Sequence, residues 1–226
     1  MNHKVHHLAG IVIAQGALLY HHVPAFSFQT IGVMMCGYGA AMFPDLDKPG
    51  SYFTQHQPFR AFSEGLSRVG VPHRGPTHSI PALILFYLLF QYVIPLPDVY
   101  VWAIILGYAS HIFLDLFNAA GVMLLYPWKL DFKLLPSFMA VSSDDHSIGQ
   151  TLIHAVLSIS FYGLLINTML DVFSHSPIIG EPIGRLHHWL VQHTSTIWKP
   201  VVRAVHASVN GTNTVLNFPK HIFGRN

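Results

Sequence analysis

The sequence predicts an all-α, membrane-embedded bundle of four to five helices followed by a C-terminal tail. Composition gives the first reason: 51% of the 226 residues are hydrophobic and only 10% are charged, whereas soluble domains carry roughly 25% charged residues. The second reason is a series of apolar runs close to the roughly 17–25 residues that a membrane-spanning helix needs. A net charge of +2 gives no indication of nucleic-acid binding, and a single cysteine excludes an intrachain disulfide.

The first two helices are expected in an N-terminal stretch that has no charged side chain between Lys4 and Asp45. Pro24 divides it into two apolar segments, about Leu8–Tyr20 and Phe28–Phe43, each near the lower length limit for a spanning helix. The first segment could instead belong to a signal peptide, but no Ala-x-Ala-like cleavage site followed by a soluble composition is present. We therefore expect both segments to be helices of the bundle.

Three further apolar helices follow a polar connection. Within that connection, Phe59–Val69 is expected to form a short amphipathic helix on the membrane surface. Ser79–Leu96 is the clearest spanning candidate, with Pro81 in its first turn, where a missing N–H is tolerated. Val99–Phe117 runs back as a fourth helix, and Thr151–Phe173 is a fifth.

The chain changes character after Phe173, where prolines, histidines and arginines replace the long apolar runs. We expect a membrane-embedded helical domain over residues 1–173 and a tail over residues 174–226. Arg185–Ile197 is the candidate surface amphipathic helix of that tail. Whether the fifth helix spans the membrane stays open, because spanning would place the positive residues of the tail on the outer side.

Counting chain reversals brings one end of each of the first four helices to the same side of the membrane. The imidazoles and carboxylates at these ends are His7, Asp45, Asp47, His73, His78, His111 and Asp115. Seven lysines and arginines lie on the same side, namely Lys4, Lys48, Arg60, Arg68, Arg74, Lys129 and Lys133, and none lies in the two opposite turns. By the positive-inside rule this side faces the cytoplasm.

Four of these residues form two pairs whose spacing suits a shared cation. Asp45 and Asp47 follow a helix two residues apart, so both carboxylates can reach one ion, although such a pair is more often a solvated helix end. His111 and Asp115 are four residues apart on one helix face, in an otherwise apolar sequence where an unpaired Asp is costly. The alternative for this second pair is a hydrogen bond within the helix.

The stretch that begins at His73 supplies a third group at the mouth of an apolar helix. His73 and His78 flank a Gly-Pro step that can turn both imidazoles inward, and Arg74 between them can hold a phosphate or carboxylate bidentately. The alternative roles of this arginine are a lipid headgroup contact or a salt bridge to the nearby carboxylates. His7 is a weaker candidate ligand, and His146 is a candidate ligand or base in a loop more typical of solvated residues.

This mixture of His and Asp side chains favours a divalent ion, with zinc first and manganese or iron as alternatives. The candidates outnumber the ligands of one tetrahedral ion, which indicates two metals or one metal with outer-shell partners. The chain has no Gly-x-Ser-x-Gly elbow, no phosphate-cradling Gly-rich loop and no Cys pair. Metal chemistry is therefore the chemistry that these residue types favour.

Three ordered motifs resemble the YdjM-like family of membrane-bound, predicted metal-dependent hydrolases. They are Pro44-Asp45-Leu46-Asp47-Lys48-Pro49-x-Ser51, His73-Arg74-Gly75-x-Thr77-His78-Ser79 and Gly107-Tyr108-x-Ser110-His111-x-x-x-Asp115, followed by Gly121-Val122-x-Leu124-Leu125-Tyr126-Pro127. The resemblance covers about residues 5–150, with His7 at the position of the family's N-terminal histidine. It implies a bacterial inner-membrane protein with a distant similarity to zinc-dependent phospholipase C and single-strand nucleases, which are all-helical enzymes with clustered His and Asp ligands.

The sequence therefore predicts a metal-dependent hydrolase at the cytoplasmic membrane face, acting on a phosphoester such as a phospholipid or lipid-linked phosphate. In this hypothesis His73 is a ligand or general base, and Arg74 stabilises negative charge on the phosphate. The alternative is a non-enzymatic membrane protein that binds or transports divalent metal, although beyond His111 and Asp115 the helices offer only Gln91 and tyrosines as polar groups. A purely structural bundle would leave all these acids and histidines without a role.

Overall fold

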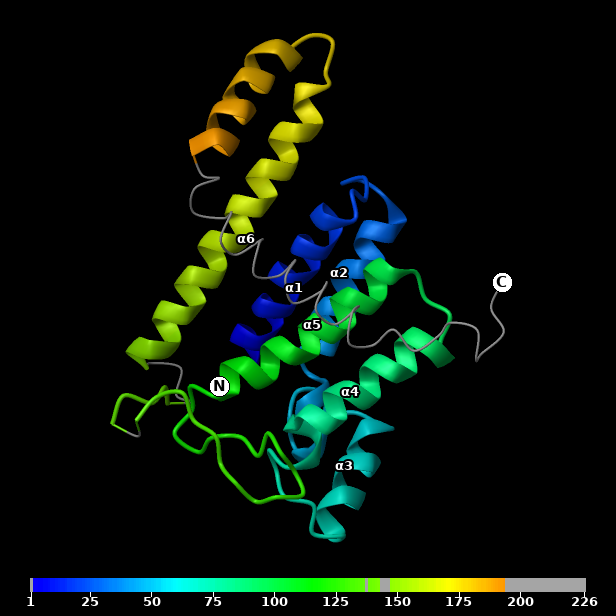
Figure 1. The fold of residues 1–226 in the computed structure, drawn as a ribbon, viewed down its shortest axis with the longest axis vertical. Helices are drawn as coiled ribbons and strands as arrows, with labels where there is room; N and C mark the ends of the chain where they lie inside the picture. Colours follow the sequence, from blue (N-terminus) through cyan, green and yellow to red (C-terminus); the bar gives the residue numbers. More distant parts are fainter. Residues whose placement is uncertain (1, 137, 143–146, 194–226) are drawn as a thin grey trace. The chain divides into compact units, whose positions relative to one another are not determined.

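The computed structural model describes residues 2–136, 138–142 and 147–193, and this part of the chain is all-α. Figure 1 shows six labelled helices: α1 (His3–Tyr20), α2 (Phe28–Ala40), α3 (Phe59–Arg68), α4 (Ile80–Leu88), α5 (Asp98–Asp115) and α6 (Ile148–Ser174). Short helical turns lie between them, namely η1 (Phe43–Asp47), η2 (Phe53–Gln55), η3 (Pro76–His78) and the π-turn η4 (Leu89–Val93). Among the described residues no β-strand forms, and only isolated bridges occur.

Three of the helices begin at side chains that cap their first backbone N–H groups. The side chain of Asn2 accepts a hydrogen bond from the Lys4 N–H at the start of α1, and Ser27 caps α2 in the same way. Ser79 caps α4, whose second residue is Pro81. These caps satisfy donors that have no partner inside a helix, and they explain why each helix starts where the polar residue precedes the apolar run.

The chain divides into two compact units, Met1–Ile166 and Asn167–Asn226. In the first unit α1, α2 and α5 pack against one another (Figure 1). They meet at Gly10, Gly37 and Gly107: a Cβ on Gly37 would lie 2.5 Å from the Gly10 carbonyl oxygen and 2.8 Å from the Ala14 Cβ. Small residues of this kind let backbones approach closely and are typical of helix contacts in membranes.

This close approach predicts that Gly37→Ala destabilises the first unit by about 1–3 kcal/mol, the usual cost of forcing an extra group into a packed core. The matched control is Gly39→Ala on the same helix, where an added Cβ meets no atom within 4 Å. We expect the control to be neutral or slightly stabilising, because alanine loses less backbone freedom than glycine. Thermal unfolding in detergent measures both, and equal unfolding temperatures would contradict this packing.

The expectation of four to five spanning helices is not met within the described residues. Only α6, with 27 residues, is both long and apolar enough to cross a membrane. α2 has 13 residues, and Ile80–Val93 is a shorter apolar helix. α1 and α5 each have 18 residues, but the site histidines and Asp115 occupy their ends and reduce their apolar length.

The second unit begins inside α6 and continues into a helix over residues 180–193. This helix overlaps the predicted amphipathic helix Arg185–Ile197, whose last four residues lie outside the described residues. An exposed ion pair joins Arg185 Nη1 to Glu181 Oε1 at 2.6 Å. The predicted domain boundary at residues 173 and 174 falls within this unit, just before the end of α6, and stays a prediction.

Candidate metal centre

Four segments of the first unit bring imidazoles and carboxylates together. They are the start of α1, the turn η1 after α2, the residues around η3 before α4, and the end of α5. Three overlapping groups result, each with ligand atoms within 4.8 Å of one another: His6–His111–Asp115, Asp45–His78–His111 and Asp47–His73–His78. The structure thus brings six of the predicted ligand and base candidates into one cluster, namely Asp45, Asp47, His73, His78, His111 and Asp115.

The middle of the cluster is a set of four atoms contributed by Asp45, His78, His111 and Asp115. The Nε2 atoms of the two histidines are 3.2 Å apart. Asp45 Oδ1 lies 3.8 and 3.6 Å from them, and Asp115 Oδ2 lies 3.7 and 3.8 Å from them. Two ligands roughly 2.0–2.2 Å from a tetrahedral ion are about 3.3–3.6 Å apart, so these spacings fit a zinc-sized ion.

Hydrogen bonds fix which nitrogen of each central histidine carries its proton. His111 Nδ1 lies 2.6 Å from the Ala41 carbonyl oxygen, which can only accept, so Nδ1 donates. Thr77 Oγ1 donates to Asp47 Oδ2 at 2.6 Å and lies 3.1 Å from His78 Nδ1, so this hydroxyl oxygen accepts from the His78 ring. In both neutral imidazoles Nε2 therefore carries no hydrogen and presents a lone pair.

These two lone pairs face each other. They are also buried, since the side chains of both histidines are 0% exposed. Acceptors that converge without a donor repel one another, and burial makes this repulsion costly. With neutral imidazoles, the carboxylates of Asp45, Asp47 and Asp115 also outnumber the Arg74 guanidinium by two negative charges. A cation at the centre would relieve this repulsion, and the buried His and Asp groups could hold a metal ion.

Asp47 holds the outer layer of the cluster in place. Its Oδ1 pairs with His73 Nδ1 at 2.8 Å, and its Oδ2 accepts from the Arg74 backbone N–H at 3.0 Å as well as from Thr77. Burial alone would raise the pKa of the Asp47 carboxyl, but its hydrogen bonds with His73 and His78 hold that pKa well below its usual range. Asp47 is therefore an anion that orients two histidines, as outer partners of metal ligands do.

Arg74 adopts a backbone conformation that is rare for a residue with a side chain, with φ of 63°. Left-handed backbone at a non-glycine residue costs free energy and persists where contacts enforce it. Here the backbone N–H bonds to Asp47, and the side-chain Nε lies 2.9 Å from Asp115 Oδ2. These two anchors place the guanidinium beside the central atoms.

The histidine that α1 contributes is His6, whereas the sequence favoured His7. His6 Nε2 lies 3.5 Å from Asp115 Oδ1, and its ring stacks on His111 with centroids 3.8 Å apart. The structure places His7 outside the cluster, stacked on Tyr38. The sequence does contain an indication of this choice. Gly10 and Ala14, four and eight positions after His6, form a stripe of small residues that marks the packed face of the helix.

Two contacts of the cluster were not predicted from the sequence, and one predicted residue cannot be placed. Asn118 donates to Asp115 Oδ1 at 2.8 Å, and the Tyr108 hydroxyl donates to the Thr77 carbonyl oxygen. Tyr108 belongs to a predicted motif and Asn118 lies just after it, but nothing in their spacing indicates these contacts. His146 lies outside the described residues.

Comparison with known proteins now assigns the family. The sequence profile of the YdjM inner membrane protein family matches residues 1–172, which include the whole cluster. The chain belongs to the YdjM family. The resemblance that the three motifs indicate is thereby confirmed, and the family description supports an inner-membrane protein.

Two relatives of this chain show how far the similarity extends. The inner membrane protein YdjM of Escherichia coli (strain K12) is 32% identical over 127 residues, which is 54% of this chain and 57% of that protein. The uncharacterized protein YvsG of Bacillus subtilis (strain 168) is 30% identical over 145 residues, covering 63% of this chain and 83% of YvsG. The match thus spans little more than half the length of the first relative. No solved structure matches the chain significantly.

Proposed function

We propose that this protein is a membrane-bound, metal-dependent hydrolase that acts on a phosphoester, such as a phospholipid or a lipid-linked phosphate. The observation that carries the proposal is the facing pair of His78 and His111 lone pairs, flanked by two carboxylates and by Arg74. Such a set suits a divalent cation, and an arginine beside it would supply the anion recognition that a phosphoester requires. Membership of a family of inner-membrane proteins supports a substrate at the membrane.

The residues divide into ligands and groups that handle the substrate. Asp45, His78, His111 and Asp115 would hold the ion, with His6 beside them. A bound divalent ion supplies Lewis-acid chemistry, lowering the pKa of a water and polarising a phosphoryl oxygen. Zinc fits the mixed His and Asp set best, and manganese or iron are alternatives.

Two side chains of the cluster are partly exposed and are the ones proposed to act on the substrate. His73 is 34% exposed, and Asp47 holds its Nδ1, so Nε2 is free to take or deliver a proton as a general base or acid. Arg74 is 15% exposed, and its fixed charge would stabilise the negative charge that develops on a phosphate. His73 therefore moves a proton in this proposal, while Arg74 orients the phosphate.

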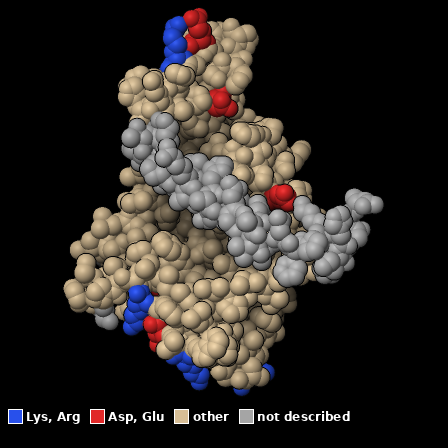
Figure 2. Space-filling view, in the orientation of Figure 1, with Lys and Arg blue, Asp and Glu red and all other residues tan. Residues whose placement is uncertain are grey.

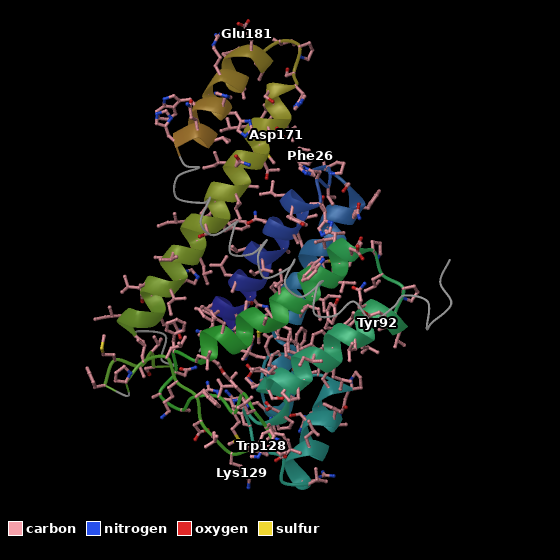
Figure 3. All side chains as sticks on the ribbon, viewed as in Figure 1. Phe26, Tyr92, Trp128, Lys129, Asp171 and Glu181 are labelled. Carbon is pink, nitrogen blue, oxygen red and sulfur yellow. The ribbon has the colours of Figure 1, made fainter. Side chains whose placement is uncertain are left out.

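The surface near α3 supports a site among lipid headgroups on the cytoplasmic face. Arg60 and Arg68 lie on α3, whose Phe62 is 54% exposed. Figure 3 labels Trp128 and Lys129 toward the same end of the first unit as α3, and Trp128 is 66% exposed. Figure 2 shows basic side chains gathered at this end. Aromatic and basic side chains together are typical of the membrane–water interface.

A metal transporter is the second candidate, but the described residues beyond the cluster offer no polar path. The helices there pack through an apolar core that includes Ala40, Val101, Ile104 and Ile105. A transport pathway would need polar or charged side chains along the bundle. The apolar core therefore favours a site at one end of the bundle over a conduit.

Hydrolysis of a fluorogenic phosphodiester lipid by the detergent-purified protein tests this function. We expect Asp115→Asn to lower the rate by about 100-fold or more, as when one strong electrostatic contact to a reacting centre is lost. The matched control is Asp98→Asn, the same change at the exposed, opposite end of α5, which should leave the rate unchanged. Unaltered activity of Asp115→Asn would overturn the proposal, and metal uptake into sealed vesicles would favour the transporter.

A further inference from the structure

A groove on the side of α1 opposite His6 is not part of the candidate metal centre. It has a volume of about 540 Å³ and lies between α1 and the first half of α6, with Tyr38 and Tyr52 on its other wall. The two helices run in parallel here: the Asn2 backbone N–H donates to Gln150 Oε1 at 3.1 Å, and Val5 and Ala9 share a core cluster with Ile153 and Leu157. Because the helices run in the same direction, one end of the groove lies near both helix starts, and the residues that line its two ends differ in chemistry.

The polar end of the groove lies at the start of both helices. Lys4 and His3 line it from α1, and His154 lines it from α6. One helical turn further along, the lining changes to Leu8 and then Ile11 on α1. On α6 the corresponding residues include Phe161. A fixed positive charge and ring N–H groups suit a phosphate, whereas the far end suits an acyl chain.

His7 gives an independent indication that the groove holds a ligand. It lines the groove and is only 7% exposed, and its Nδ1 pairs with the Tyr38 carbonyl oxygen at 3.4 Å. Its Nε2 is therefore an acceptor, and this buried atom has no hydrogen-bond partner among the described residues. Buried polar atoms are rarely left unpaired, so a bound donor is expected at this point, and a ligand hydroxyl in the groove would supply it.

We propose that the groove between α1 and α6 binds one anionic phospholipid whose headgroup carries a free hydroxyl. The phosphate would contact Lys4 and His154, the headgroup hydroxyl would donate to His7 Nε2, and an acyl chain would lie along Leu8, Ile11 and Phe161. The apolar end of the groove favours a lipid over free phosphate, because a small ion would leave that end empty. Among the described residues α6 is also the one helix long and apolar enough to cross a membrane, and a membrane position of α6 would bring this groove into contact with bilayer lipids.

Native mass spectrometry of the delipidated full chain in detergent tests this site. The probes are phosphatidylglycerol and phosphatidylcholine with identical acyl chains. We expect phosphatidylglycerol to be retained preferentially, and the double variant Lys4→Ala/His154→Ala to weaken its retention roughly tenfold, as expected for lost charge-assisted contacts. Lys133→Ala, which removes an exposed lysine outside the groove lining, is the matched control and should retain the lipid. Equal retention of both lipids by the unaltered protein would overturn the proposal.

Two further variants test the hydroxyl and the acyl chain. The unaltered protein should prefer phosphatidylglycerol over phosphatidylethanol, an anionic phosphodiester lipid whose headgroup has no hydroxyl. His7→Phe keeps a ring beside Tyr38 but removes the acceptor, so this preference should disappear. Ser158→Trp fills the groove and should exclude the lipid while Lys4 remains. Unchanged preference in the first variant or unchanged binding in the second would contradict the site, as would displacement of the lipid by inorganic phosphate alone. Thermal unfolding of each variant checks that it is folded.

Discussion

Replacing His111 with alanine is expected to weaken metal binding by more than about 100-fold, beyond the 10–100-fold effects of losing an outer-shell partner. The His111 ring contributes Nε2 to the central four atoms, and its Nδ1 is already fixed by the Ala41 carbonyl oxygen. Alanine removes the ligand and leaves Asp45 and Asp115 facing each other across a buried gap. The loss should therefore appear in metal content as well as in folding stability at low metal concentration.

The measurement is a competition titration of zinc against a chromogenic chelator, with His56→Ala as the matched control. His56 is exposed and belongs to none of the candidate metal groups. We expect the control to bind zinc as the unaltered protein does. If His111→Ala and His56→Ala had the same zinc affinity, the central site would have been assigned wrongly.

Replacing Arg74 with glycine is expected to lower phosphoester hydrolysis by about 10²–10³-fold while metal is retained. Glycine adopts a φ of 63° without the strain that a side chain brings. The backbone N–H that bonds to Asp47 is preserved by this change, so the η3 region should keep its structure. Only the guanidinium beside Asp115 is removed, and the loss of rate would report on that group.

Arg74→Lys provides the comparison, because it keeps the charge but loses the planar fork that binds phosphate bidentately. We expect this variant to recover part of the rate. The two variants are compared by initial rates at saturating metal. A full rate for Arg74→Gly would show that the guanidinium has only a structural role toward Asp115.

Much of the site could be predicted from the sequence because its residues lie at helix ends. Counting chain reversals placed Asp45, His78 and His111 at the same end of the bundle, and the structure brings them together. The i, i+4 spacing of His111 and Asp115 placed both on one face of α5. The order and direction of the helices are enough to bring these residues to one end, whether or not each helix spans the membrane.

What could not be predicted depends on contacts between distant backbone groups. The proton positions on His78 and His111 follow from Thr77 and the Ala41 carbonyl oxygen, and no spacing rule indicates these partners. The choice of His6 over His7 depends on which face of α1 packs, where one residue changes the direction of the side chain by about 100°. Within the described residues only α6 is long and apolar enough to span, because cluster residues occupy the ends of α1 and α5 and α2 has only 13 residues.

Elemental analysis of the purified, folded protein shows whether the His/Asp cluster holds a metal ion. We expect the unaltered chain, supplied with zinc, manganese and iron salts and then desalted, to retain at least about one divalent ion per molecule. A strong chelator should remove this ion, and His78→Ala should retain far less of it. A folded protein that retains no divalent ion under these conditions, or that retains it equally after His78→Ala, would rule out a metal site at this cluster.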